Sequence, residues 1–103
     1  MLEKIKITVI KKYKPEDVLG HEVKQSTTGK RIPSCQFFEE GQEFIAEHSF
    51  KMPDGFCGWA WRDLTVRFTK FDLLDEDWPE PGVTYVACGD GLRPVIFKLE
   101  KLN

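Results

Sequence analysis

The residues best suited to chemistry are three cysteines, Cys35, Cys57 and Cys88, which lie far apart in a chain of 103 residues. No short C-x-x-C step joins them, and three thiols cannot all pair within one chain. Thiols act as nucleophiles, redox groups and metal ligands. The cysteines therefore raise the hypothesis of a cysteine enzyme, a redox centre or a metal site, which depends on whether the fold brings them together.

Cys57 is the strongest candidate for a catalytic thiol. It follows the turn-forming run Pro53-Asp54-Gly55, and we expect a helix to begin there with Asp54 as its N-cap residue. The positive end of the helix dipole stabilises a thiolate in the first turn, whereas a carboxylate beside the sulfur disfavours it. Cys57 also falls on the apolar face of this helix, where a buried cysteine behaves as a small hydrophobic side chain.

A metal centre would require the three cysteines to converge, with His21, His48 or an aspartate as a further ligand. Their spacing differs from that of zinc knuckles and ribbons, so we expect no metal. His48 lies beside a predicted strand and His21 lies in a polar loop, and both positions are typical of surface histidines.

Four other residues are candidates for ligand binding: Trp59, Trp78, Asp90 and Arg93. Trp59 falls outside the apolar face of its helix, so we expect its ring to cover a neighbouring strand, with a ligand or a second chain as alternatives. Trp78 is the expected anchor of the acidic surface loop over residues 72–82. In the run C-G-D-G-L-R-P, Asp90 could pair with Arg93 across the turn, and the two glycines would let a ligand approach the backbone. More often, G-D-G forms only a tight turn in which Asp90 binds its own loop.

The elements that position these residues follow from hydrophobic periodicity. The main helix is predicted from Phe56 to Thr69 because apolar residues recur there at three- and four-residue spacings. This face is expected to pack on a sheet that contains Ile7, Val9, Val95 and Phe97. The face comprises Cys57, Ala60, Trp61, Leu64, Phe68 and Phe71.

Alternation of apolar and polar residues predicts a half-buried strand over residues 4–13 and a second strand over residues 43–47. Residues 83–88 and 93–100 predict a hairpin, with Pro94 at a strand start. One or two helical turns are expected from Pro15 to Gly20, followed by a polar loop over residues 21–31. These elements favour an α+β fold: one domain over residues 1–103, with a small, mostly antiparallel sheet of about four strands and one main helix packed on it.

Composition narrows the classes of function. The chain is 41% hydrophobic and has no apolar run long enough to cross a bilayer, and its N-terminus lacks the apolar core of a signal peptide. We therefore expect a soluble, cytoplasmic protein with free thiols and no membrane partner. Residues 1–31 carry eight Lys and Arg against four Asp and Glu, but the lysines are dispersed, so we also expect no nucleic-acid partner.

Three blocks of the chain resemble a family of small, uncharacterised prokaryotic proteins of about 100 residues. The blocks are C-x-x-F-x-x-G-Q-x-F from Cys35, P-x-G-F-C-x-x-A-W from Pro53, and C-x-D-G-L-R-P-V-I-F-K-L-E from Cys88. Relatives carry proline after the first cysteine, whereas Gln36 stands here, so a fixed turn at Cys35 is not expected. The resemblance implies a shared architecture and brings no activity.

Two hypotheses for function follow. The first is a domain that binds a small molecule or a protein partner through the surface around Trp59, Trp78 and residues 89–93. A second copy of the chain over this surface would make a homo-oligomer. The alternative is a thiol-centred protein built on Cys57 with Cys35 or Cys88. The chain has no G-x-G-x-x-G, Walker or H-E-x-x-H motif, and it assigns neither a reaction nor a cofactor.

Overall fold

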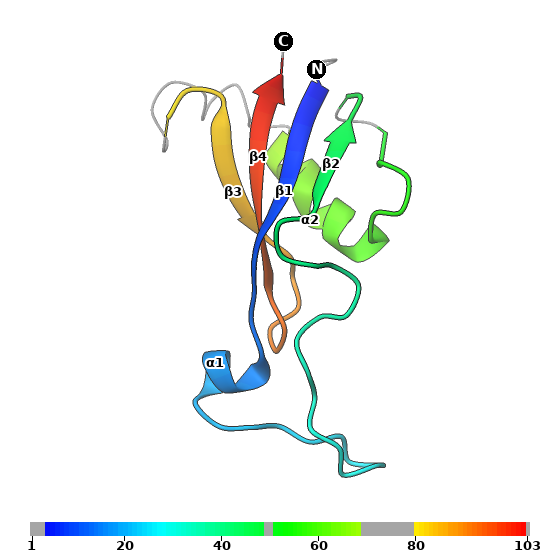
Figure 1. Ribbon diagram of the computed structural model, residues 1–103, viewed down its shortest axis with the longest axis vertical. Coiled ribbons are helices and arrows are strands. Elements are labelled where there is room, and N and C mark those ends of the chain that lie inside the picture. Colours follow the sequence, from blue (N-terminus) through cyan, green and yellow to red (C-terminus); the bar gives the residue numbers. More distant parts are fainter. Residues whose placement is uncertain (1–3, 49–50, 69–79, 103) are drawn as a thin grey trace.

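The computed structural model describes residues 4–48, 51–68 and 80–102. Four strands form one antiparallel sheet in the order β2-β1-β4-β3 (Figure 1). The strands are β1 (Lys4–Lys12), β2 (Glu43–Ala46), β3 (Val83–Ala87) and β4 (Val95–Leu102). The main helix is α2 (Gly58–Phe68), and a short helix, α1 (Pro15–Leu19), follows β1. The predicted α+β class is confirmed, and the predicted strands agree with the structure to within about two residues at each end.

One face of the sheet forms the core. Residues that pair directly in an antiparallel sheet point to the same face, and Ile7 lies opposite Phe44 on one side and Leu99 on the other. Val9 lies opposite Phe97 in the same way. Helix α2 lies against this face (Figure 1) and adds the buried side chains of Ala60 and Leu64. The predicted contact between the helix and the sheet is thereby confirmed for Ala60 and Leu64.

The partly buried Cys57 and Trp61 also pack against this core, as predicted. Phe71 and the side chain of Phe68, which belong to the same predicted face, lie outside the described residues.

The start of the main helix differs from the prediction. Helix α2 begins at Gly58, two residues after the expected Phe56, and Thr69 at its expected end lies outside the described residues. Pro53-Asp54-Gly55 forms a separate turn, in which Gly55 has a φ of 77° and the Phe56 N–H donates to the Pro53 carbonyl at 3.2 Å. The predicted N-cap role of Asp54 is therefore wrong, because the turn chemistry ends before the helix begins. The first helical carbonyl is that of Cys57, which accepts the Trp61 N–H at 2.9 Å.

A bulge in β1 changes the direction of its last residues. The pairing with β4 shifts between Val9 and Lys11, which leaves Ile10 as the extra residue of the strand. After this shift the Lys12 side chain is only 16% exposed. Its Nζ donates to the Cys35 carbonyl at 2.9 Å, so the end of β1 holds the segment that carries the first cysteine.

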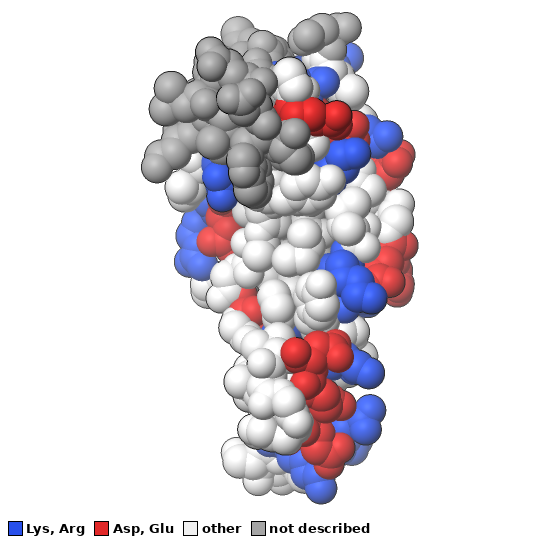
Figure 2. Space-filling view, turned by 90° about the vertical axis from the view of Figure 1, so that its left-hand side faces the viewer, with Lys and Arg blue, Asp and Glu red and all other residues white. Residues whose placement is uncertain are grey.

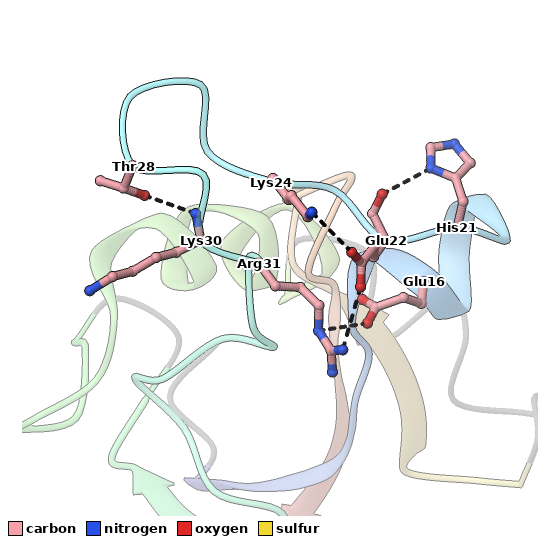
Figure 3. A network of polar contacts seen from close by, with 7 residues as sticks. All are labelled: Glu16, His21, Glu22, Lys24, Thr28, Lys30 and Arg31. Atoms are coloured by element: carbon pink, nitrogen blue, oxygen red, sulfur yellow. Dashed lines mark hydrogen bonds and ion pairs between the residues drawn. The ribbon is translucent and has the colours of Figure 1, made fainter.

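Residues 13–34 form an arm that extends beyond the sheet (Figure 1). Helix α1 ends as predicted at Gly20, which has a φ of 82° and donates to the Glu16 carbonyl at 2.9 Å. The polar stretch predicted as a loop contains one isolated β-bridge, which joins Lys24 and Arg31. The Arg31 guanidinium also lies between the carboxylates of Glu16 and Glu22, at 3.1 and 3.5 Å (Figure 3).

No helix among the described residues is long and apolar enough to cross a membrane.

Candidate functional site

A cavity of about 580 Å³ lies where three separate segments of the chain meet. Cys35 to Phe38 contribute the first wall, residues 57–63 at the start of α2 contribute the second, and residues 88–95 between β3 and β4 contribute the third. All three cysteines line this one cavity. The fold thus brings together residues that the sequence places far apart.

The first wall is held in place by Phe38. This side chain is 1% exposed and lies among the rings of Phe44, Phe56 and Phe97, with ring centroids 5.1 to 5.9 Å away. Edge-to-face packing of this kind adds to the burial of each ring. The neighbouring residue Phe37 is exposed and lines the cavity.

Helix α2 packs one face into the core, and residues at its start that lie outside this face form the second wall. Ala60 and Leu64 point into the core, so Trp59 and Arg62 fall on sides of the helix that the core does not cover. Trp59 is 75% exposed, and the Arg62 guanidinium carbon lies 5.1 Å from its ring centroid. The expectation that a neighbouring strand covers Trp59 is therefore wrong, because this ring meets a cation and the cavity instead.

Asp63 joins the second wall to the third. Its Oδ2 accepts the backbone N–H of Gly89 at 2.7 Å, which connects α2 to the turn after β3. A Cβ atom at position 89 would lie 3.2 Å from this oxygen, so glycine allows the close approach. A carboxylate that accepts a backbone N–H makes a stronger hydrogen bond than a neutral acceptor does.

The third wall is a turn organised by Asp90. Its Oδ1 accepts the N–H groups of Leu92 and Arg93, both at 3.0 Å, and its Oδ2 accepts the Arg93 Nε–H at 3.2 Å. Both expectations for this turn hold together: Asp90 binds its own loop, and it also pairs with Arg93. Burial would raise the pKa of Asp90, but the two backbone N–H donors and the Arg93 guanidinium outweigh burial and hold that pKa below the ordinary value of an aspartate.

The three thiols are free, and each is half-buried against the core. The Cys88 sulfur accepts the Val95 N–H at 3.4 Å, and Cys57 occupies the position immediately before α2. Within residues 4–48, 51–68 and 80–102, no group of three His, Cys, Asp or Glu side chains could hold a metal ion. Sharing one cavity therefore does not make the cysteines of the described chain a metal ligand set.

Six of the residues singled out from the sequence line this cavity: Cys35, Cys57, Cys88, Trp59, Asp90 and Arg93. Trp78 lies outside the described residues. His21 is exposed in the arm, where its Nδ1 lies 3.1 Å from the Glu22 carbonyl oxygen (Figure 3), and His48 is half-buried after β2. Neither histidine lines the cavity.

Sequence reasoning missed Phe37, Arg62 and Asp63 as residues of the site. Arg62 follows Trp59 by three residues in a predicted helix, and that spacing could have suggested a cation resting on the ring. Asp63 and Gly89 are 26 residues apart, and nothing in the local sequence of either one indicates their hydrogen bond.

No family model matches the chain, and no curated protein or solved structure matches it either. The resemblance carried by the three sequence blocks therefore stays a prediction.

Proposed function

We propose that the protein binds a small molecule with an apolar or aromatic body in the cavity between residues 35–38, 57–63 and 88–95. The observation that carries this proposal is the convergence of three distant segments on one cavity beside an indole ring that is 75% exposed. A large aromatic side chain left in solvent next to a cavity is typical of a binding surface. The cavity volume of about 580 Å³ also falls within the usual range for small-molecule sites.

The hydrogen bonds that hold the third wall of the cavity support ligand binding over a purely structural role. Asp63 and Asp90 hold the third wall through hydrogen bonds to backbone N–H groups, so the turn keeps its shape without a ligand. A site formed in advance loses less conformational entropy when a ligand binds. Trp59 and Phe37 remain exposed as contact surfaces, and the Phe37 ring packs edge-on against Phe38 at a centroid distance of 5.1 Å.

The test is an NMR titration of the ¹⁵N-labelled protein with two neutral aromatic probes, indole and 2-naphthol. We expect saturable shifts at the amides of residues 35–38, 57–63 and 88–95. Trp59→Ala should weaken binding by about 1 kcal/mol through loss of an aromatic contact. Tyr85→Ala is the matched control, since Tyr85 is also an exposed aromatic residue but does not line the cavity.

Shifts that are absent or scattered over the whole surface would rule out a small-molecule site here. Shifts around Trp59 that change on dilution of the protein alone would instead indicate that a second copy of the chain covers this surface.

A thiol-centred function is the second candidate, because all three cysteines line the same cavity. Cys57 precedes α2, whose first N–H groups lack helical acceptors, and the Cys88 sulfur accepts the Val95 N–H. Alkylation of the native protein, described in the Discussion, tests this candidate.

A further inference from the structure

Two arginines line the cavity, and among the described residues each contacts an aspartate through its Nε. Arg93 uses its Nε to bind Asp90, and the Arg62 Nε lies 4.0 Å from Asp63 Oδ1. Within the described part of the chain, the Nη nitrogens of both arginines have no hydrogen-bond partner. A guanidinium presents its N–H groups as a planar fork that matches a carboxylate, so each arginine keeps an open edge for an anion.

The position of Arg62 links this open edge to the aromatic wall. Its guanidinium carbon lies 5.1 Å from the Trp59 ring centroid, in the range of a cation–π contact. A guanidinium that stacks on a ring through its face keeps its N–H bonds pointing outward in its own plane. A ligand whose apolar body lies along Trp59 could therefore place an anionic group within reach of Arg62.

The charges around the cavity limit how negative this group can be. Arg62 and Arg93 supply two positive charges, and Asp63 and Asp90 supply two negative charges. A phosphate dianion would meet strong repulsion from both carboxylates, whereas a ligand carboxylate carries one negative charge and meets less repulsion. The balance of charge thus favours a monoanion over a dianion.

We infer that the ligand of this cavity is an aromatic or apolar monocarboxylate, bound through its carboxylate by Arg62 and Arg93 and through its body by Trp59 and Phe37. This inference rests on the proposed function and adds the chemical class of the ligand. It also gives the two arginines a role that their contacts with Asp63 and Asp90 leave open.

The experiment compares 2-naphthoate with its neutral counterpart 2-naphthamide, by calorimetry and by NMR titration of the native protein at pH 7. We expect the carboxylate to bind about tenfold more tightly, which is the ordinary gain from a hydrogen bond to a charged group. Arg62→Gln should remove most of this difference between the carboxylate and the amide. Arg67→Gln is the matched control, because Arg67 belongs to the same helix and does not line the cavity.

Arg93→Lys adds a second measurement, since lysine keeps the positive charge beside Asp90 but lacks the planar guanidinium that matches a carboxylate. We expect it to weaken 2-naphthoate binding severalfold. Equal affinity for the acid and the amide, or an equal loss in Arg62→Gln and Arg67→Gln, would overturn the monocarboxylate and leave the binding site standing. Tighter binding of 2-naphthyl phosphate than of 2-naphthoate would overturn it too. Failure of all three compounds, together with indole and 2-naphthol, would overturn the site itself.

Discussion

Asp90 is the residue that holds one wall of the cavity, because a single carboxylate binds two backbone N–H groups and a guanidinium. These three donors hold the pKa of Asp90 below its ordinary value in the folded protein despite burial. A carboxyl group whose pKa is lower in the folded state contributes stability at pH values above its unfolded pKa. That contribution is lost as the pH falls through the lower, folded pKa, where both states become protonated.

Asp90→Asn should therefore destabilise the protein at pH 7 and matter less in acid. The amide oxygen can still accept backbone N–H groups, but it loses the charge opposite Arg93, and for a partly exposed pair this costs about 0.5 kcal/mol. Urea unfolding of both proteins at pH 7 and at pH 3 measures the difference. If the difference in free energy of unfolding between the two proteins is larger at pH 3 than at pH 7, the assigned direction of the pKa shift is wrong.

The cysteines give a second prediction at this scale. Iodoacetamide should modify Cys57 before Cys35 and Cys88 in the native protein, because only Cys57 lies directly before a helix, a position common among reactive cysteines. Asp54 adds nothing to this expectation, because its turn ends before α2 begins at Gly58. Site-resolved mass spectrometry across a pH series measures the three rates, and urea-unfolded protein is the control in which the rates should become similar.

If Cys57 stays unmodified until the protein unfolds while Cys35 or Cys88 reacts near neutral pH, the thiol hypothesis moves to that other residue. Cys57 would then act only as a small hydrophobic side chain against the core.

At the scale of elements, the periodic patterns predicted the fold well. Strand β4 shows why: Val95, Phe97 and Leu99 alternate with half-buried residues, and all three are fully buried. The same pattern placed Ile7 and Val9 on the inner face of β1. Alternation is a local property of the chain, and the two-residue period of a strand converts it directly into one buried face.

The start of α2 and the walls of the cavity were harder to predict because they depend on contacts between distant residues. A turn at Gly55 and a helix start at Gly58 use similar residue types, so turn chemistry alone could not separate them. Phe38 occupies the centre of an aromatic cluster, yet it lies in a segment without periodicity. Its burial depends on rings from β2, β4 and the turn before α2.

The packing of α2 gives the prediction for this scale. Leu64 is 0% exposed, so Leu64→Ala should leave a cavity and lower the free energy of unfolding by about 2–5 kcal/mol. Val66→Ala is the control on the same helix, because Val66 is 62% exposed and should cost less than about 0.5 kcal/mol. Chemical denaturation measures both variants. Equal effects of the two substitutions would show that the face of α2 is wrongly assigned.

At the scale of the whole molecule, the distribution of charge differs from what the two ends of the sequence suggest. Residues 1–31 carry an excess of positive charge, but strand pairing places acids from the rest of the chain beside them. Lys6 lies 3.2 Å from Glu43, and Lys4 lies 3.9 Å from Glu47, in both cases across the pairing of β1 with β2. Figure 2 shows the two signs side by side on one face of the molecule.

The arm repeats this arrangement at the other end of a molecule that measures 47 by 28 by 21 Å. Its Arg31 is bound by Glu16 and Glu22, and Lys24 lies 3.7 Å from Glu22 (Figure 3). Basic side chains with acidic neighbours attract a polyanion weakly, because each neighbouring carboxylate offsets the attraction. Specific nucleic-acid binding also needs counterion release from many phosphates at once.

We therefore predict that the protein does not bind duplex DNA or RNA with a dissociation constant below about 1 µM at physiological salt, which is tighter than ordinary non-specific binding. Fluorescence anisotropy of labelled 20-base-pair duplexes, titrated with protein at 50 and 150 mM salt, is the measurement. Paired charges should give weak binding at both salt concentrations, since few counterions would be released. Sub-micromolar binding that weakens steeply with salt would mean that the lysines of residues 1–31 act together as a basic surface despite their acidic neighbours.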